Sequence, residues 1–200
     1  ISFSQSLPPF NTALLQSAAV NRLGFSAKKT MRVAQQLYEG IELGEKGSVG
    51  LITYMRTDSF RVSDTSVAQV RDFIKKEYGP AYLPDKPRVV TTKKSAQDAH
   101  EAIRPTDVML RPEVISKYLN NDQLRLYKLI WHQFVASQMS AARYELVNTD
   151  ITAEDCLFRA SGKRLLFDGH LRAAYSREKQ DFQILPSLDP GQELTLKELA

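Results

Sequence analysis

The spacing of hydrophobic residues along this chain changes near Arg143, and this change limits the folds that the chain can adopt. Before this residue, apolar side chains recur at helical spacing, which is typical of amphipathic helices. After it, apolar and polar side chains alternate over short runs bounded by turn residues, which is typical of strands. The sequence therefore predicts an α+β protein, in which a mainly helical domain is followed by an antiparallel β-rich domain.

Local signals place the helices. Asn11 or Thr12 caps a helix over 13–23 that stops at Gly24, and Ser26 caps a second helix over 27–39. These two helices form a helix-turn-helix candidate, and the strand and helix expected after them make the arrangement resemble a winged helix. Further helices are predicted over 64–78, over 97–103 behind a capping box at Ser95, over 112–119, and over 122–142.

The strands are predicted from β-branched and aromatic runs. The first is LITYM (51–55), which follows a glycine-rich loop. Cys156 is expected to be a buried thiol in one of the later strands. Those strands are expected over 145–152, 156–161, 164–167, 170–176, 182–185 and 193–197, with turns at 161–163, 168–169 and 189–191.

Composition excludes several classes of protein. With 42% hydrophobic and 25% charged residues, the chain has the balance of a water-soluble globular protein, and no apolar stretch is long enough to cross a bilayer. One cysteine and three scattered histidines lack the spacing of a zinc site. We expect a cytoplasmic protein, and we interpret the chain as a piece of a longer polypeptide.

The distribution of charge points to a polyanion. Lys and Arg number 27 against 23 Asp and Glu, a formal net charge of +4. Residues 1–38 hold four basic side chains and no acidic one, and the run 86–94 is also free of acids. Basic patches on a neutral background favour nucleic acid as the partner, with ordinary solvated lysines as the alternative.

One segment carries chemistry that this partner would need. On a strand, Tyr54 and Arg56 would project to the same side. A guanidinium favours the phenolate form of tyrosine and can hold a phosphate through two hydrogen bonds, so this pair suits attack on a phosphodiester. A tyrosine in a strand is also often a packing residue. No nucleotide-binding loop, zinc-protease motif or serine-hydrolase motif occurs in the sequence.

Five segments stand out in sequence order: PPFNTALLQ (8–16), LGFSAKKTMRVAQQLYEG (23–40), LITYMRTDS (51–59), SAQDAHEAIRPTD (95–107) and FVASQM (134–139). Together they resemble the motifs of type IA DNA topoisomerases. Met55 and the string HEAIRPT are closer to bacterial topoisomerase I than to topoisomerase III or reverse gyrase.

The resemblance implies an isomerase activity. Tyr54 would cleave one DNA strand through a 5′-phosphotyrosine link, another strand would pass, and the break would be resealed without ATP. The substrates implied are single-stranded and negatively supercoiled DNA, in the bacterial cytoplasm at the nucleoid and away from membranes. The resemblance also implies a Mg²⁺ ion bound by an acidic domain outside these residues, with no metal ligand in this chain. Without that domain and the strand-binding domain of the same polypeptide, the isolated chain is expected to be inactive.

The resemblance also assigns roles to individual residues. Tyr54, Arg56 and His100 are the catalytic set, in which Arg56 holds the scissile phosphate and His100, expected on the first turns of a capped helix, donates to it. Asp58 and Glu101 orient other groups. Arg104 contacts DNA or caps a carboxylate, two alternatives of equal weight. The remaining candidate contacts to the DNA backbone are Lys28, Lys29, Arg32 and Thr57.

Three domain segments follow from this reading. Residues 1–8 end an arch-domain segment or linker, 9–142 form the winged-helix-like domain with Tyr54, and 143–200 are the β-rich part of the arch domain. The alternative function is a non-catalytic winged-helix module that only binds DNA. A third possibility is a structural domain whose basic residues meet another protein.

Overall fold

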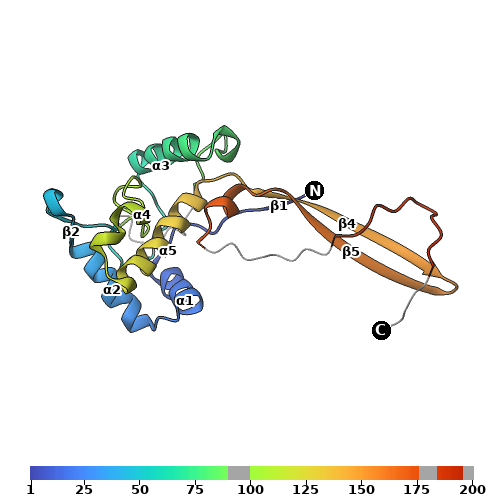
Figure 1. The fold of residues 1–200 in the computed structure, drawn as a ribbon, viewed down its shortest axis with the longest axis horizontal. Coiled ribbons are helices and arrows are strands. Elements are labelled where there is room, and N and C mark those ends of the chain that lie inside the picture. Colours follow the sequence, from blue (N-terminus) through green and yellow to red (C-terminus); the bar gives the residue numbers. More distant parts are fainter. Residues whose placement is uncertain (90–99, 176–183, 196–200) are drawn as a thin grey trace.

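The computed structural model describes residues 1–89, 100–175 and 184–195. It shows a helical body from which a long two-stranded ribbon extends (Figure 1). The α+β fold class expected from the sequence is therefore confirmed. The winged-helix arrangement inside the body and the three domain limits stay predictions.

The first two helices form as predicted. Helix α1 (Thr12–Leu23) begins where the Asn11 side chain accepts a hydrogen bond from the Leu14 amide, at 2.9 Å. It ends at Gly24, whose φ of +67° is the left-handed cap that favours glycine. Helix α2 (Ala27–Glu39) begins at Ser26, whose side chain accepts from the Lys29 amide. A small hairpin of β2 (Ile41–Glu42) and β3 (Ser48–Val49) encloses the short 3₁₀ turn Gly44–Lys46 in the loop that follows.

Helix α5 (Asn121–Ser137) runs through the middle of the body (Figure 1). A capping box between Asn120 and Gln123 starts it. It stops at Ser137, short of the predicted residue 142, because Ala142 already pairs in a strand. The body also contains α3 (Asp64–Glu77) and the 3₁₀ turn Pro80–Tyr82. The predicted helix 112–119 is divided into α4 (Pro112–Ile115) and the 3₁₀ turn Ser116–Tyr118.

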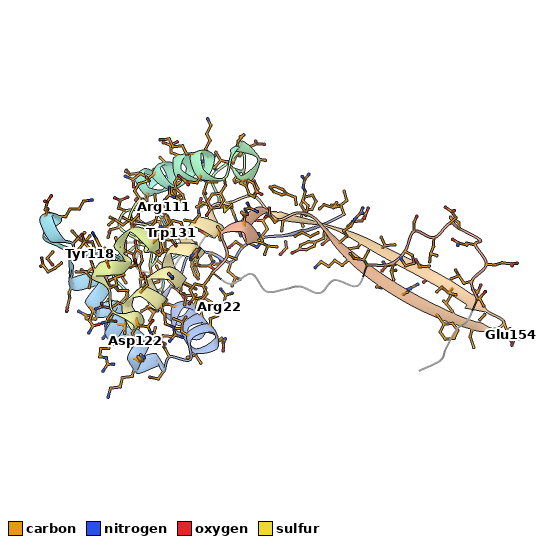
Figure 2. All side chains as sticks on the ribbon, viewed as in Figure 1. Arg22, Arg111, Tyr118, Asp122, Trp131 and Glu154 are labelled. Carbon is orange, nitrogen blue, oxygen red and sulfur yellow. The ribbon has the colours of Figure 1, made fainter. Side chains whose placement is uncertain are left out.

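The ribbon consists of β4 (Ala142–Ala153) and β5 (Cys156–Phe167), paired antiparallel, with β1 (Ser2–Ser4) beside β4 at its base. Its tip is at Glu154, which adopts a φ of +51° (Figure 2).

Several predictions for the region after residue 143 were wrong. The first, a turn at 161–163, fails because β4 and β5 pair without interruption through these residues, and Gly162 pairs with Val147 in the middle of the ladder. Cys156 is exposed, not buried. Residues 169–173 form a 3₁₀ turn instead of a strand, and the described residues 184–185 and 193–195 contain none. The turn at 189–191 is confirmed by a bond from the Gln192 amide to the Asp189 carbonyl.

Candidate active site

The LITYM segment lies in the interior of the body, beside residues 101–106. Instead of the predicted strand, it makes a single β-bridge, between Ile52 and Pro105. The Thr53 amide donates to the Arg104 carbonyl at 3.0 Å, and the Thr53 hydroxyl donates to the Ala102 carbonyl at 2.6 Å. These bonds fix the backbone immediately before Tyr54.

Thr12 fixes the backbone on the other side of Tyr54. Its hydroxyl lies 2.8 Å from the Met55 carbonyl, and it accepts from the Thr57 amide at 2.8 Å. The Thr12 amide in turn donates to the Thr57 carbonyl at 2.9 Å. Since Met55 is also almost fully buried, the chain on both sides of Tyr54 is held in place.

The Tyr54 ring contacts two other rings. Its centroid lies 5.4 Å from that of His100, with the planes tilted by 31°. The Tyr38 ring, at the end of α2, also lies 5.4 Å away and meets it at 65°, edge to face. Tyr54 is half-buried, and no residue of the described ranges hydrogen-bonds its hydroxyl. The structure thus brings together Tyr54 and His100, which the resemblance had paired.

His100 does not occupy the predicted helix. Residues 100–102 form neither helix nor strand, and Ile103 makes an isolated β-bridge with Phe10, in which the Ile103 amide donates to the Phe10 carbonyl at 2.7 Å. Residues 97–99 and Ser95 lie outside the described residues. Within residues 100–103 the helix prediction fails because the Ala102 and Ile103 amides donate to the distant carbonyls of Arg61 and Phe10.

Arg56 and Asp58 are exposed on the segment that follows Tyr54. In the part of the chain that the structure describes, neither makes an ion pair, and no hydrogen bond joins Arg56 to Tyr54. Thr57 is buried, and its hydroxyl accepts from the Ser59 amide at 3.0 Å. Arg56 therefore has its guanidinium available to a ligand, whereas the Thr57 side chain is used within the fold.

Arg104 and Glu101 form an ion pair. The Arg104 guanidinium is buried and contacts the Glu101 carboxylate, with nitrogen–oxygen distances of 2.6 and 2.8 Å. It also donates to the Pro105 carbonyl at 2.9 Å. Of the two alternatives raised for Arg104, the structure shows the carboxylate contact, and a contact to DNA stays a prediction.

The basic residues of α2 differ from one another. Lys28 and Arg32 are exposed. The Lys29 ammonium lies 2.8 Å from the Asp122 carboxylate and 4.2 Å from the centre of the Phe25 ring. The ion pair of Lys29 with Asp122 thus joins the first turn of α2 to the first turn of α5.

Sequence reasoning missed two residues of this site. Tyr38 is assigned no role in the site from the sequence, and Thr12 is named there only as a possible helix cap. Both residues belong to segments that resemble the family, LGFSAKKTMRVAQQLYEG and PPFNTALLQ, and that membership is the available signal.

The described residues do not fit a metal site. Within 1–89, 100–175 and 184–195, no three His, Cys, Asp or Glu side chains lie close enough to hold an ion. None of the helices in these ranges is long and apolar enough to span a bilayer.

Comparison with known proteins identifies the family. The family model described as DNA topoisomerase matches residues 3–200. DNA topoisomerase 1 of Campylobacter jejuni is 46% identical over 193 residues, which are 96% of this chain and 27% of that protein. The structure of full-length topoisomerase I from Thermotoga maritima matches with a TM-score of 0.80 and 38% identity, over 94% of this chain and 30% of that one. The chain thus spans less than a third of the length of these relatives, and it belongs to the type IA DNA topoisomerase family, alongside its bacterial topoisomerase I members.

Proposed function

We propose that Tyr54 is the nucleophile of this topoisomerase and that the chain carries the cleavage centre of a DNA-relaxing enzyme. The phenolic oxygen attacks the phosphorus of a phosphodiester in single-stranded DNA. A bond forms between this oxygen and phosphorus, the bond from phosphorus to the 3′ oxygen breaks, and the proton lost from Tyr54 is balanced by one gained at that 3′ oxygen. The reverse attack reseals the strand after another strand has passed.

One observation carries the proposal: Tyr54 is half-buried on a fixed backbone, beside His100 and with an unpaired guanidinium two residues away. A buried packing tyrosine usually finds a hydrogen-bond partner for its hydroxyl, as Tyr127 does with the Leu110 carbonyl at 2.7 Å. The Tyr54 hydroxyl has none in the described part of the chain. The Tyr54 hydroxyl is therefore not used in a hydrogen bond within the described fold, as the proposal requires.

Arg56 and His100 take the supporting roles. Arg56 holds the scissile phosphate and stabilises the charge that develops on its oxygens. His100, whose ring contacts the Tyr54 ring, donates a hydrogen bond from an imidazole nitrogen to the same phosphate. Lys28 and Arg32 are exposed and can hold the DNA backbone further along α2, where each contact would add about one unit to the salt dependence of binding.

The complete reaction needs more than this chain. We expect Mg²⁺ to be bound by acidic residues of the same polypeptide outside this chain, because the described residues offer no such set. Strand passage and relaxation of negatively supercoiled DNA likewise belong to the longer enzyme, in the bacterial cytoplasm and at the nucleoid. Alone, the chain should bind DNA weakly and leave a supercoiled plasmid unchanged.

The direct test is Tyr54→Phe in the complete polypeptide. A 3′-end-labelled single-stranded oligonucleotide is mixed with each protein and Mg²⁺, and the covalent adduct is counted after denaturation. We expect the substitution to lower adduct formation by roughly a thousandfold or more, because it removes the attacking atom. Oligonucleotide affinity should stay near the wild-type value.

Tyr118→Phe is the control, since Tyr118 is an exposed tyrosine on a 3₁₀ turn of the same body. It should form the adduct at the wild-type rate. If the Tyr54→Phe protein still forms the adduct, Tyr54 is not the nucleophile. If no protein forms one although the oligonucleotide binds in a salt-dependent way, the non-catalytic DNA-binding module is the better description.

A further inference from the structure

Tyr38 meets the Tyr54 ring from a rigid part of the body. It lies in the last turn of α2, and its neighbour Leu37 is fully buried. The Leu51 amide donates to the Leu37 carbonyl at 2.7 Å, which joins the end of α2 directly to the segment that leads to Tyr54. The edge-to-face contact between the two rings is therefore built on a fixed frame.

Gly50 shows how closely the two segments approach. A Cβ atom at this position would lie 2.7 Å from the Tyr38 carbonyl oxygen, closer than real contacts allow. The backbone before Tyr54 thus passes against the backbone of Tyr38 itself. Any side chain at position 50 would separate α2 from the Tyr54 segment.

The contact involves the Tyr38 ring and not its hydroxyl. Tyr38 is 40% exposed, and its hydroxyl makes no hydrogen bond to the described residues. No ring contact joins Tyr38 to His100 in these ranges, so the two rings meet different parts of Tyr54. Since the Tyr54 hydroxyl also lacks a described partner, contacts to its ring are the main restraint on where its oxygen points.

We propose that Tyr38 is a positioning residue for Tyr54: its ring holds the Tyr54 ring in the orientation from which the phenolic oxygen attacks DNA. This inference rests on the proposed function. Attack on phosphorus requires the oxygen to lie opposite the leaving 3′ oxygen, and a displacement of about 1 Å can lower a rate by about a hundredfold. The Tyr38 ring blocks side-chain rotations of Tyr54 that would move its oxygen away from the position opposite the leaving 3′ oxygen.

The test compares Tyr38→Leu and Tyr38→Phe in the complete polypeptide. Under single-turnover conditions, adduct formation is followed on a saturating 3′-end-labelled oligonucleotide, and oligonucleotide affinity is measured separately. Tyr38→Leu should lower the rate at saturation by between about tenfold and a hundredfold and leave the affinity unchanged. Tyr38→Phe keeps the ring and should restore the rate to within about twofold of wild type. Tyr118→Leu, the same change at a similarly exposed tyrosine, should alter neither quantity.

Gly50→Ala tests the frame without touching the ring. It should also lower the rate at saturation, because α2 must move away from the Tyr54 segment. This variant decides the matter if Tyr38→Leu fails to fold.

The inference is overturned if Tyr38→Leu, or Gly50→Ala in its place, cleaves at the wild-type rate. It is overturned as well if Tyr38→Phe is as slow as Tyr38→Leu, since the hydroxyl would then be the active group. A loss of affinity with an unchanged rate would make Tyr38 a DNA contact instead. Tyr54→Phe runs beside them: if that protein still forms the adduct, the proposed function itself fails, whatever Tyr38 does.

Discussion

The helical body and the β4–β5 ribbon are held together by different forces. The largest fully buried side chains of the described structure all lie between Leu15 and Phe134, inside the body. In the ribbon, Leu157 is 63% exposed and Phe158 50%. The body therefore has a hydrophobic core of its own, whereas the ribbon depends on its hydrogen-bonded ladder and on the β1 strand at its base.

The candidate site lies in the body and not in the ribbon. The two rings that contact Tyr54, those of Tyr38 and His100, belong to the body, and the segments that fix it come from α1, α2 and the segment 101–106. Beyond its base, the ribbon is joined across its strands by exposed ion pairs, such as Asp150 with Arg159 and Glu145 with Arg164. Exposed pairs of this kind contribute little to stability. The candidate site thus rests on the part of the molecule with a core.

The sharpest test of this comparison is the same substitution in each region. Leu126 is fully buried in α5, so Leu126→Ala should lower the free energy of unfolding by about 2 to 5 kcal/mol. Leu157→Ala, in the exposed part of the ribbon, should change it by less than about 0.5 kcal/mol. Urea unfolding followed by circular dichroism measures both. Equal losses would mean that the ribbon shares the core of the body.

Sequence reasoning succeeded where the signals are local. Helices α1 and α2 were predicted closely because Asn11, Ser26 and Gly24 act on residues within one turn of themselves. In the ribbon, by contrast, the glycine-containing segment 161–163 suggested a turn that the long ladder overrides. The turn at Glu154 lacks a glycine, but it falls in the gap between the predicted strands 145–152 and 156–161, so its position was predicted.

The site itself is made by contacts that no local signal can predict. Thr53 bonds to residues near Arg104, and Thr12 bonds to Met55 and Thr57 from more than forty residues away. Spacing alone therefore predicted neither the non-helical residues 100–103 nor the contact of Tyr38 with Tyr54. The family motifs grouped Tyr54 with His100, and the rings of these two residues are in contact in the structure.

The junction between body and ribbon offers a second test, with a smaller effect. Gly169 has a φ of +46°, and a Cβ there would lie 2.5 Å from the Ser140 carbonyl oxygen, where α5 gives way to β4. Gly169→Ala should cost about 3 kcal/mol, from the left-handed backbone and the clash together. Gly24→Ala, with a φ of +67° and no atom within 4 Å, should cost about 1 to 2 kcal/mol. If the two substitutions lower the free energy of unfolding equally, the backbone at the junction can shift to relieve the clash, and the ribbon is loosely attached.

Two histidines at the same junction make its stability depend on pH. His132 of α5 lies 2.9 Å from the Ala173 carbonyl, and His170 is buried, with an Nδ1 atom that has no hydrogen-bond partner among the residues that the structure describes. Burial lowers the pKa of both below the ordinary value of 6.5. The Ala173 carbonyl partly opposes the shift at His132, and the nearby Arg88 adds to it at His170.

Because the folded pKa values are lowered, the unfolded chain binds these protons first as the pH falls. Stability should therefore be complete above about pH 7 and fall as the pH drops through 6.5 toward the lowered values. His132→Gln and His170→Gln should each flatten urea unfolding midpoints measured from pH 7.5 to pH 5, a range above the ordinary titration of carboxylates. Unchanged slopes would show that the junction opens before the body unfolds, so that both imidazoles already meet water. The contrast would then lie between a stable body and a ribbon whose attachment is itself in equilibrium.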